Sequence, residues 1–515
     1  MAGWDEGYVS DVGYTMGYYG EMNPLRMRMA LIGAGWEAPR VVNACELGYG
    51  QGLSINLHAA ASPVAWWGTD FAPAQASFAR GLGSASGADV HLFDDSFAEF
   101  TNRPDMPEFD FIALHGIWSW VSEKNRSLIV DFIRRKLKVG GVAYVSYNVQ
   151  PGWSTFAPMR DLMALHGALL GAPGQGSLRR ASSALEFAER LLAVDPMYAR
   201  ANPVVQKRIG DLRTKPAEYI AHEYLNRDWH PMLLSAIADC LEPAKLQFAC
   251  SARPLDHVDG LHLTEGQQQM LDELPAGGAR ETLRDFMVNQ QFRADYWIKG
   301  GRRLSARERA MQLGAMRIVL TDRPSTVLEG KVRGTLGEGA LKAEVYGPVL
   351  DALADHLPHT YAAVVEHAVQ RGVTASAAEQ AVWVLMGCAR VWPVAEEGAI
   401  EQARVHAAQL NAHVLARREA DAGLPYLASP VLGGGYAVNE FAQWLLLAMR
   451  ESGKGSQSED LARKVSAQME SRGRRPVKNG QELSGSAQGL EALTQLTQEF
   501  VLHELPILQK LGIAA

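Results

Sequence analysis

Cysteine is scarce in this chain, and its few copies lie far apart. Four occur among 515 residues, mostly in apolar surroundings and without metal-ligand spacing: Cys45, Cys240, Cys250 and Cys388. This pattern excludes a disulfide framework and predicts buried, reduced thiols with no metal site.

Long apolar runs are also missing. No run reaches the roughly 18 residues that a membrane-spanning helix needs, and the start of the chain lacks a basic segment followed by an apolar one. We therefore expect no membrane span, a cytoplasmic location and a protein of bacterial type.

The chain has no excess of positive charge. Its formal net charge is -7, with 50 Lys and Arg against 57 Asp and Glu, which argues against nucleic acid as the main partner. With 47% hydrophobic residues over this length, the chain can bury two or three cores.

The most informative segment is residues 41–53, a predicted buried strand that ends in an acid, Glu46, and runs into Gly48, Gly50 and Gly52. Glycines let a turn approach a ligand with no Cβ in the way, and the helix that follows can point its first N–H groups at that ligand. The order acid-x-G-x-G-x-G differs from the dinucleotide pattern G-x-G-x-x-G. A carboxylate here repels a pyrophosphate but pairs with an ammonium group, such as that of S-adenosylmethionine. The segment resembles the first motif of class I methyltransferases.

Acids follow the next two predicted strands. Asp70 closes an apolar strand at 64–70, at the distance where nucleotide folds place the acid that accepts ribose hydroxyls. A strand at 89–93 runs into Asp-Asp-Ser at 94–96, where similar enzymes hold the adenine amino group. These residues can equally cap helices or lie in solvated turns, but their shared place at the ends of successive strands favours a ligand site.

Further strands are predicted at 109–116 and 141–148, with a helix at 126–137 between them. Five strands with intervening helices fit a parallel, doubly wound α/β sheet, and strand-like segments at 245–250 and 292–299 would complete a seven-stranded, Rossmann-like class I methyltransferase fold. The predicted parts are a cofactor-binding core at 1–154, a helical insertion or cap at 155–228, the rest of the sheet at 229–300, a helical or winged-helix-like middle domain at 301–425, and a C-terminal domain at 426–515.

Aromatic-rich segments flank the expected site. The irregular stretch before the glycines either packs its tyrosines on the domain edge or closes Tyr14 and Tyr18 over the methionine moiety. The turn at 147–153 offers one wall of an acceptor pocket and 115–120 the other, although their tryptophans can equally fill the core. The expected cofactor contacts are Tyr14, Tyr18, Glu46, Gly48, Tyr49, Gly50, Gly52, Asp70, Phe71, Asp94, Asp95, Ser96 and His115.

Several motifs together resemble bacterial methyltransferases that carry a methyltransferase regulatory domain, among them the rickettsial protein lysine methyltransferases acting on outer-membrane proteins. They are ELGYGQG at 46–52, HGIWSWV at 115–121, YNVQPGW at 147–153, AHEYLNRDW at 221–229 and NQQFR at 289–293. The stretches 426–433 and 505–512 extend the likeness over nearly the whole chain. The resemblance implies S-adenosylmethionine as cofactor and a protein lysine as methyl acceptor. The tyrosine-rich leader departs from the group's proline- and histidine-rich start, so the oligomeric state stays open.

Methyl transfer to an amine needs a neutral acceptor, whereas the pKa of free lysine is about 10.4. Desolvation lowers that pKa, and a nearby imidazole or carboxylate can take the proton directly or through water. Aromatic rings can flank the amine and the sulfonium by cation–π contacts. The catalytic candidates are His115, Trp118, Tyr147, Asn148, His222, Glu223 and Tyr224. A histidine and a glutamate at a helix start can equally serve as caps.

The sequence leaves two other functions open. The same chemistry on a small metabolite or a surface-polysaccharide precursor would use a sealed pocket, and a non-catalytic regulatory protein would keep the cofactor fold without turnover. The intact acid and glycines of residues 46–52 favour an enzyme. Within 345–393, amphipathic helices rich in acids predict protein docking or a scaffold rather than DNA binding.

Overall fold

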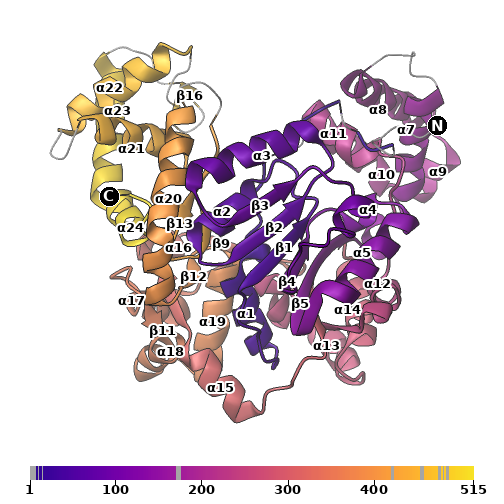
Figure 1. Cartoon of the computed structure of the whole chain (residues 1–515), viewed down its shortest axis with the longest axis horizontal. Coiled ribbons are helices and arrows are strands. Elements are labelled where there is room, and N and C mark those ends of the chain that lie inside the picture. Colours follow the sequence, from indigo (N-terminus) through magenta and orange to yellow (C-terminus); the bar gives the residue numbers. More distant parts are fainter. Residues whose placement is uncertain are drawn as a thin grey trace.

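A seven-stranded sheet forms the centre of the molecule (Figure 1). The computed structural model describes residues 7–9, 11–13, 16–169, 176–418, 423–452, 457–473, 477–478, 481–482 and 487–514. The strands of the sheet are β1 (Asn43–Leu47), β2 (Ala65–Thr69), β3 (Val90–Phe93), β4 (Phe109–Leu114), β5 (Leu137–Asn148), β6 (Leu246–Ser251) and β7 (Phe292–Lys299).

The strand order is β3-β2-β1-β4-β5-β7-β6, and β7 runs antiparallel to both of its neighbours. The other pairs among β1 to β5 are parallel. This confirms the predicted class I methyltransferase fold. Because β1 to β5 are parallel, their carboxyl ends share one edge of the sheet, where open α/β folds bind their ligands.

Helices cover both faces of the sheet. The helices α1 (Pro24–Gly33), α2 (Leu53–Ala61) and α3 (Pro73–Ser86) pack on one face, after the short helix η1 (Gly20–Met22). The other face carries α4 (Phe97–Phe100), η2 (Trp118–Trp120), α5 (Glu123–Lys136) and α12 (Leu234–Leu241). Strands β1, β4 and β5 are buried from both sides, which explains their near-continuous apolar runs.

A helical insertion separates β5 from β6. It begins after α6 (Gln150–Trp153) and contains α7 (Ala157–Leu169), α8 (Ser177–Ala193), α9 (Met197–Ala201), α10 (Val204–Leu212) and α11 (Ala217–Tyr224). These helices have a core of their own, which Val9 of the N-terminal segment joins. The segment between β6 and β7 then forms α13 (Glu265–Asp272) and α14 (Gly278–Val288), and α14 contacts α12.

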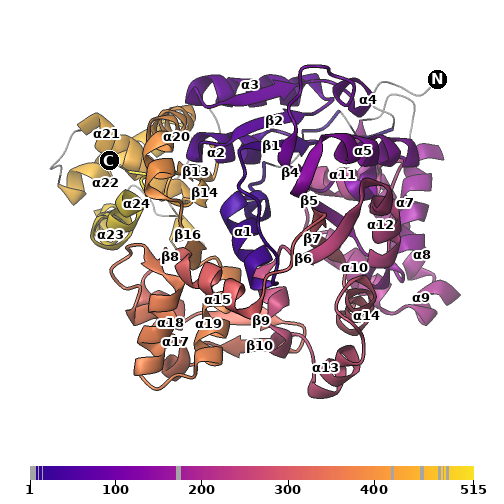
Figure 2. The ribbon, with the colours of Figure 1, turned by 60° about the horizontal axis from the view of Figure 1, so that its bottom comes forward.

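The middle of the chain forms a module below α1 in the view of Figure 2. Its strands β11 (His359–Thr360), β8 (Arg317–Leu320) and β12 (Val391–Pro393) make a small antiparallel sheet in that order. The remaining elements are α15 (Ala306–Ala315), α16 (Pro324–Leu328), β9 (Lys331–Gly334), β10 (Gly337–Ala340), α17 (Ala343–Asp351), α18 (Tyr361–Gln370) and α19 (Ala375–Gly387). Helices α17, α18 and α19 contact one another and bury the apolar face of the module.

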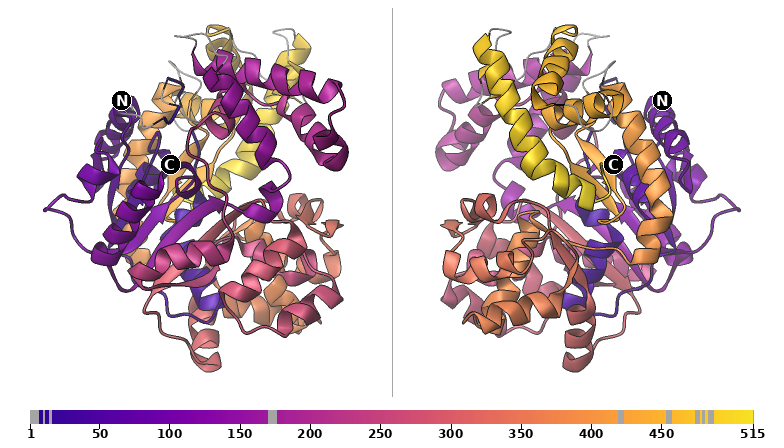
Figure 3. Two further views of the ribbon diagram at one scale, coloured as in Figure 1. Left: turned by 90° about the vertical axis from the view of Figure 1, so that its right-hand side faces the viewer. Right: turned by 90° about the vertical axis from the view of Figure 1, so that its left-hand side faces the viewer.

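The C-terminal part lies against the side of the main sheet that carries α2. Figure 3 shows these orange and yellow helices beside the indigo and purple N-terminal ones. The elements are α20 (Glu397–Arg417), β13 (Tyr426–Ser429), β14 (Gly434–Ala437), α21 (Glu440–Ser452), α22 (Ser458–Glu470), β15 (Val477–Lys478), β16 (Gln481–Glu482), α23 (Ala487–Glu499), a π-helical turn (Phe500–Glu504) and α24 (Leu505–Lys510). Helix α2 contacts α20, β13 and β14, so its whole surface is buried. Throughout the described ranges, the chain forms no helix with both the length and the apolar character to cross a bilayer.

Candidate functional site

Three glycines shape the turn between β1 and α2. Gly48, Gly50 and Gly52 have φ values of +74°, +57° and +68°, in the left-handed region that other residues rarely adopt. A Cβ at Gly48 would also lie 2.3 Å from Cδ1 of Ile117, and one at Gly52 would lie 2.4 Å from Cβ of Ala79. The turn therefore needs glycine for its backbone and for close packing against two neighbouring segments.

Asp70 ties this turn to the end of β2. Its Oδ2 accepts a hydrogen bond from the Gly50 N–H at 2.8 Å, and its Oδ1 accepts one from the Ala72 N–H at 3.0 Å. Burial raises the pKa of Asp70 to about 6 although both hydrogen bonds act in the opposite direction.

Glu46 lies deeper in the same place. Its side chain is 3% exposed, and Oε2 has no hydrogen-bond partner among the described residues. Burial and the nearby Asp70 raise the pKa of Glu46 to about 8. A buried carboxylate with an unsatisfied oxygen fits a cationic group, because an ammonium would supply both the charge and the missing donor.

A pocket opens at these acids, along the carboxyl ends of the strands. Of the expected cofactor contacts, it brings together Glu46, Gly48, Tyr49, Gly50, Asp70, Phe71, Asp95, Ser96 and His115. Gly7, Tyr8, Gly17 and Tyr19 of the N-terminal segment also line it. Tyr49 borders the pocket with its hydroxyl donating to the Phe93 carbonyl at 2.6 Å, which joins the glycine turn to β3.

The three residues after β3 divide between the pocket and helix capping. Ser96 caps α4 in a reciprocal pair with Glu99, and it still lines the pocket. Asp95 lines the pocket while its carboxylate contacts Arg103 at 3.0 Å. Asp94 lies outside the pocket, because its side chain turns to the surface and pairs with Arg80 of α3 at 2.5 Å.

Two other expected cofactor contacts also lie elsewhere. The ring of Tyr18 packs between His58 and Tyr426, at centroid distances of 5.1 and 5.3 Å, so it joins the C-terminal part instead of the pocket. Gly52 faces α3 rather than the pocket. The prediction for Tyr14 lies outside the described residues.

Tyr8 and Tyr19 are tyrosines of the N-terminal segment that line the pocket, where we expected Tyr18. Tyr19 stacks on the ring of His115 with centroids 3.5 Å apart, and its N–H donates to Ser54 of α2. Tyr8 packs edge-on against Phe71. The tyrosine-rich composition indicated an aromatic cover, but an irregular segment has no periodicity to show which rings face inward.

A second pocket adjoins the first, and the two share His115, Gly116 and Trp120. The other lining residues come from the end of β5, α6, the insertion and the segment that leads into and includes the start of β7: Asn148, Trp153, Arg208, Tyr219, Glu223, Gln291 and Phe292. Trp120, Trp153, Tyr219 and Phe292 make this pocket aromatic. Both predicted walls contribute to it, but Arg208, Tyr219 and the β7 residues were missed. The motif at 289–293 was the only signal for Gln291 and Phe292, and the sequence carried none for Arg208 and Tyr219.

Glu223 and Arg208 give the second pocket its charges. The Arg208 guanidinium lies 3.8 Å from the centre of the Trp153 ring. Burial raises the pKa of Glu223 to about 7, although Arg208 and Arg160 pull it down. Near neutral pH this carboxyl group can therefore gain or lose a proton.

His115 stands at the junction of the two pockets. Its Nδ1 lies 2.7 Å from the Tyr144 hydroxyl, and burial lowers its pKa to about 4. The imidazole is therefore neutral at physiological pH, with its orientation fixed by Tyr144 and by the stacked Tyr19.

Four expected catalytic residues lie outside both pockets. Trp118 is fully buried in the core beneath β4 and β5, and Tyr224 packs against Trp153 and Phe156 in the core of the insertion. Tyr147 is buried with its hydroxyl on Asp295. His222 is 3% exposed and packs behind Tyr8. Each lies on a strand or helix, where neighbouring side chains point in different directions. Composition alone did not tell which of them point into the pocket.

Comparisons with known proteins agree with the fold. The family described as "Predicted methyltransferase regulatory domain" matches residues 216–299, which run from α11 to the end of β7. The protein sll1526 of Synechocystis sp. is 37% identical over 516 residues, covering 99% of this chain and 100% of its own.

Two solved structures share the fold over the whole chain. PKMT2 from Rickettsia typhi in complex with AdoHcy superposes with a TM-score of 0.69 at 15% identity, covering 97% of this chain and 99% of that one. A second structure of PKMT2 from Rickettsia typhi gives a TM-score of 0.68 at 14% identity, with the same coverage.

The fold is that of the class I S-adenosylmethionine-dependent methyltransferases, and residues 216–299 match a methyltransferase regulatory domain. The chain belongs to the same family as sll1526 of Synechocystis.

Proposed function

We propose that this protein transfers a methyl group from S-adenosylmethionine to the side-chain amine of a lysine in a protein substrate. The observation that carries the proposal is the pair of pockets that meet at His115. One holds two buried carboxylates, and the other has aromatic walls and a carboxyl group of raised pKa. The whole-length fold likeness to PKMT2 of Rickettsia typhi supports this choice.

In the first pocket, Glu46 would pair with the ammonium group of the cofactor's amino-acid tail. Asp70 would accept hydrogen bonds from the ribose, since each of its oxygens has one lone pair left after the backbone contacts. Phe71, Asp95 and Ser96 line the same pocket and would border the base. The cofactor supplies an electrophilic methyl group on a sulfonium, and the turn at Gly48 and Gly50 lets the backbone approach it closely.

In the second pocket, the aromatic walls would desolvate the lysine amine and so lower its pKa from about 10.4 toward neutrality. The nitrogen lone pair forms the new N–C bond as the C–S bond breaks, and a thioether leaves. The proton that the nitrogen then carries goes to Glu223, directly or through water. The rings of Trp120 and Trp153 would stabilise, by cation–π contacts, the positive charge that develops on the nitrogen as the new bond forms.

Arg208 favours a second candidate, a small metabolite that bears an anionic group. Its guanidinium lies in the same pocket, where it can hold a carboxylate or phosphate as well as balance Glu223.

Incubation of the enzyme with a cell lysate and labelled S-adenosylmethionine, followed by mass spectrometry, distinguishes the two candidate functions. Label on peptide lysines supports the protein substrate, label confined to small molecules supports the second candidate, and no label supports a non-catalytic regulator.

Glu223→Gln tests the proton acceptor. We expect its kcat to fall about a hundredfold or more, because the amide cannot take the proton. The wild-type rate should rise as pH increases through about 7, where Glu223 loses its proton, and the variant should lose that rise. Glu218→Gln is the matched control, since Glu218 is exposed on the same helix. Equal rates and pH profiles for wild type and Glu223→Gln would remove Glu223 from the mechanism.

A further inference from the structure

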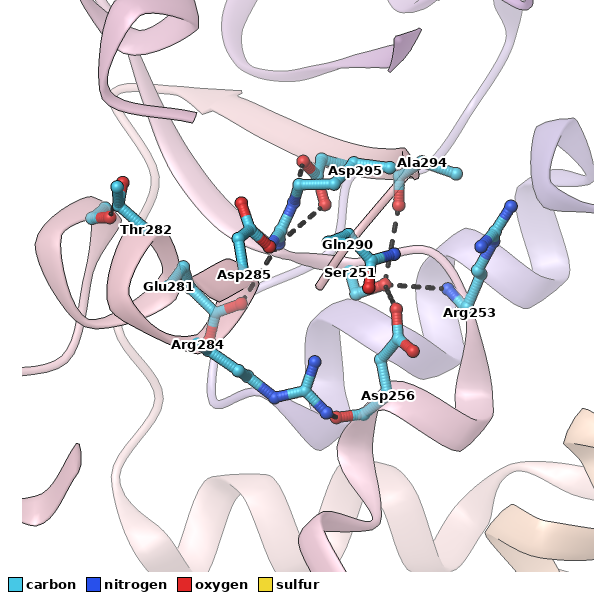
Figure 4. Close-up of polar contacts among 12 residues, drawn as sticks. Ser251, Arg253, Asp256, Glu281, Thr282, Arg284, Asp285, Gln290, Ala294 and Asp295 are labelled. Atoms are coloured by element: carbon cyan, nitrogen blue, oxygen red, sulfur yellow. Dashed lines mark hydrogen bonds and ion pairs between the residues drawn. The ribbon is translucent and has the colours of Figure 1, made fainter. Parts of the chain in front are cut away.

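Arg293, at the start of β7, is buried among three carboxylates. Its side chain is 4% exposed, and its nitrogens lie 2.7 Å from Asp295, 2.6 Å from Asp285 and 3.0 Å from Glu281. Asp285 and Glu281 are one turn apart on α14, and Figure 4 shows them converging with Asp295 of β7. The network therefore joins α14 to the sheet.

The charges of this network do not balance. One guanidinium faces three carboxylates, and burial raises the pKa of Asp285 to about 7 despite the attraction of Arg293. Buried ion networks gain little net stability, because desolvation of the charges offsets their attraction. A guanidinium does provide a fixed geometry, because its N–H groups point in set directions. Here it holds α14 and β7 in one relative position.

The strand end that Arg293 holds is also a wall of the second pocket. Gln291 and Phe292 precede Arg293 directly and line that pocket. The Phe292 carbonyl accepts hydrogen bonds from Arg253 at 3.2 Å and from Gln290 at 2.7 Å.

The facing strand is fixed by the same network. The Tyr147 hydroxyl donates to Oδ2 of Asp295 at 2.6 Å, and Tyr147 pairs with Arg293 in the β5–β7 register. The next pair in that register joins Asn148 to Phe292, and both line the second pocket. Tyr147 therefore contributes to the site through Asp295 and Arg293 rather than by contact with the acceptor.

We infer that Arg293 is a positioning residue, through which α14 of the regulatory segment sets the acceptor wall at Gln291 and Phe292 while leaving the cofactor pocket alone. This inference rests on the proposed function for its kinetic consequences. None of Arg293, Asp285 and Glu281 lines the first pocket, so the two pockets are separable by experiment.

The test uses the full chain with Arg293→Gln, Arg293→Lys and the milder Tyr147→Phe, which removes a single hydroxyl. Three properties are measured: the Kd of S-adenosylhomocysteine by calorimetry, the acceptor KM and kcat, and amide hydrogen exchange at 289–294, 146–150 and 44–52. Arg418→Gln is the matched control, because Arg418 is 3% exposed and hydrogen-bonded to Gln443 in the C-terminal part.

We expect Arg293→Gln to raise the acceptor KM about tenfold or more, with the Kd of S-adenosylhomocysteine within about twofold of wild type. Exchange should quicken at 289–294 and 146–150 but not at 44–52. Arg293→Lys should recover part of the loss, and Tyr147→Phe should shift KM in the same direction by less. Arg418→Gln should change neither KM nor exchange at 289–294.

Unchanged KM and exchange in Arg293→Gln and Tyr147→Phe would overturn the inference. So would equal quickening of exchange at 44–52 and 289–294, because that pattern marks general destabilisation. If the wild-type protein methylates no acceptor, the proposed function fails, and the exchange pattern alone decides the positioning role.

Discussion

Gly48 meets two constraints that no other residue type meets together. Its φ of +74° disfavours any side chain, and the space where a Cβ would lie is filled by Ile117. Gly140 has almost the same backbone, with φ of +79°, but apart from its chain neighbours no atom of the described residues lies within 4 Å of where a Cβ would be. A comparison of substitutions at the two positions therefore distinguishes the effect of backbone strain, which both share, from the effect of close packing, which only Gly48 has.

Gly48→Ala should therefore weaken S-adenosylhomocysteine binding by about tenfold or more, because Ile117 and the turn must move apart at the pocket. Gly140→Ala should cost about 1 kcal/mol of unfolding free energy and leave binding unchanged. Calorimetry and chemical denaturation check both. If the two variants bind alike, close packing at Gly48 is irrelevant to the pocket.

Glu46 should couple cofactor binding to proton release. Its pKa of about 8 keeps it mostly protonated at pH 7, and an ammonium ligand favours the charged form. Binding at pH 7 should then release about one proton, and affinity should rise with pH until about 8 and level off there. Calorimetric heats in buffers of high and low ionisation enthalpy should differ for wild type and agree for Glu46→Gln. The same heat in all buffers for the wild type would contradict the pairing.

The sequence predicted the site residues whose place follows from their position at the end of a strand. It did not predict which way a side chain points where tertiary packing decides that. Glu46 lies at the end of β1, and Gly48, Gly50 and Asp70 come shortly after the ends of strands, so chain position fixed them at the ligand edge. Trp118 and Tyr147 are just as close to strand ends, yet they point into the core. They share that core with α12, which is distant in sequence, and no local pattern reveals this contact.

Element boundaries followed apolar runs and local caps. The predicted bounds of the strand at 292–299 agree with those of β7. Helix α5 begins at Glu123 instead of the predicted 126, because the Ser122 side chain caps it by accepting a hydrogen bond from the Asn125 N–H. β5 begins at Leu137 rather than 141 because it pairs with β4 through an irregular register near Phe109, which no local pattern reveals.

The α6 turn and the start of β7 are in direct contact at Gly152. A Cβ there would lie 2.4 Å from Cγ of Gln291 and 2.5 Å from the Gln290 carbonyl oxygen. Gly152→Ala should raise the acceptor KM about tenfold and leave the Kd of S-adenosylhomocysteine unchanged. At Gly210 on α10, no atom of the described residues beyond the helix's own backbone and the chain neighbours lies within 4 Å of where a Cβ would be. Gly210→Ala should therefore gain about 0.5–1 kcal/mol of stability without a change in KM. Loss of cofactor binding in Gly152→Ala would show that the two pockets are not independent.

At the scale of the whole molecule, the glycine turn and the C-terminal part belong to one core. Leu53 and Leu57 of α2 share a hydrophobic cluster with Leu410 of α20 and Trp444 of α21. The sequence carried only a weak signal for this: α2 has no Asp, Glu, Lys or Arg, although Ser54, Asn56 and His58 are polar, and a helix covered by one sheet alone would keep a charged, solvated face. Its partner could not be identified, because it lies about 350 residues away in the chain and no local pattern links the two.

Ala407 and Ala408 of α20 make this shared core testable. Ala407 is fully buried in the cluster, while Ala408 is exposed. Ala407→Asp buries an unpaired carboxylate, so the free energy of unfolding should fall by about 3–5 kcal/mol. Ala408→Asp should change it by less than about 0.5 kcal/mol.

Since α2 begins at the glycine turn, Ala407→Asp should also weaken S-adenosylhomocysteine binding, and Ala408→Asp should not. Chemical denaturation and calorimetry on the same samples check both effects. Loss of stability in Ala407→Asp with full cofactor affinity would mean that the C-terminal part folds separately from the site it covers.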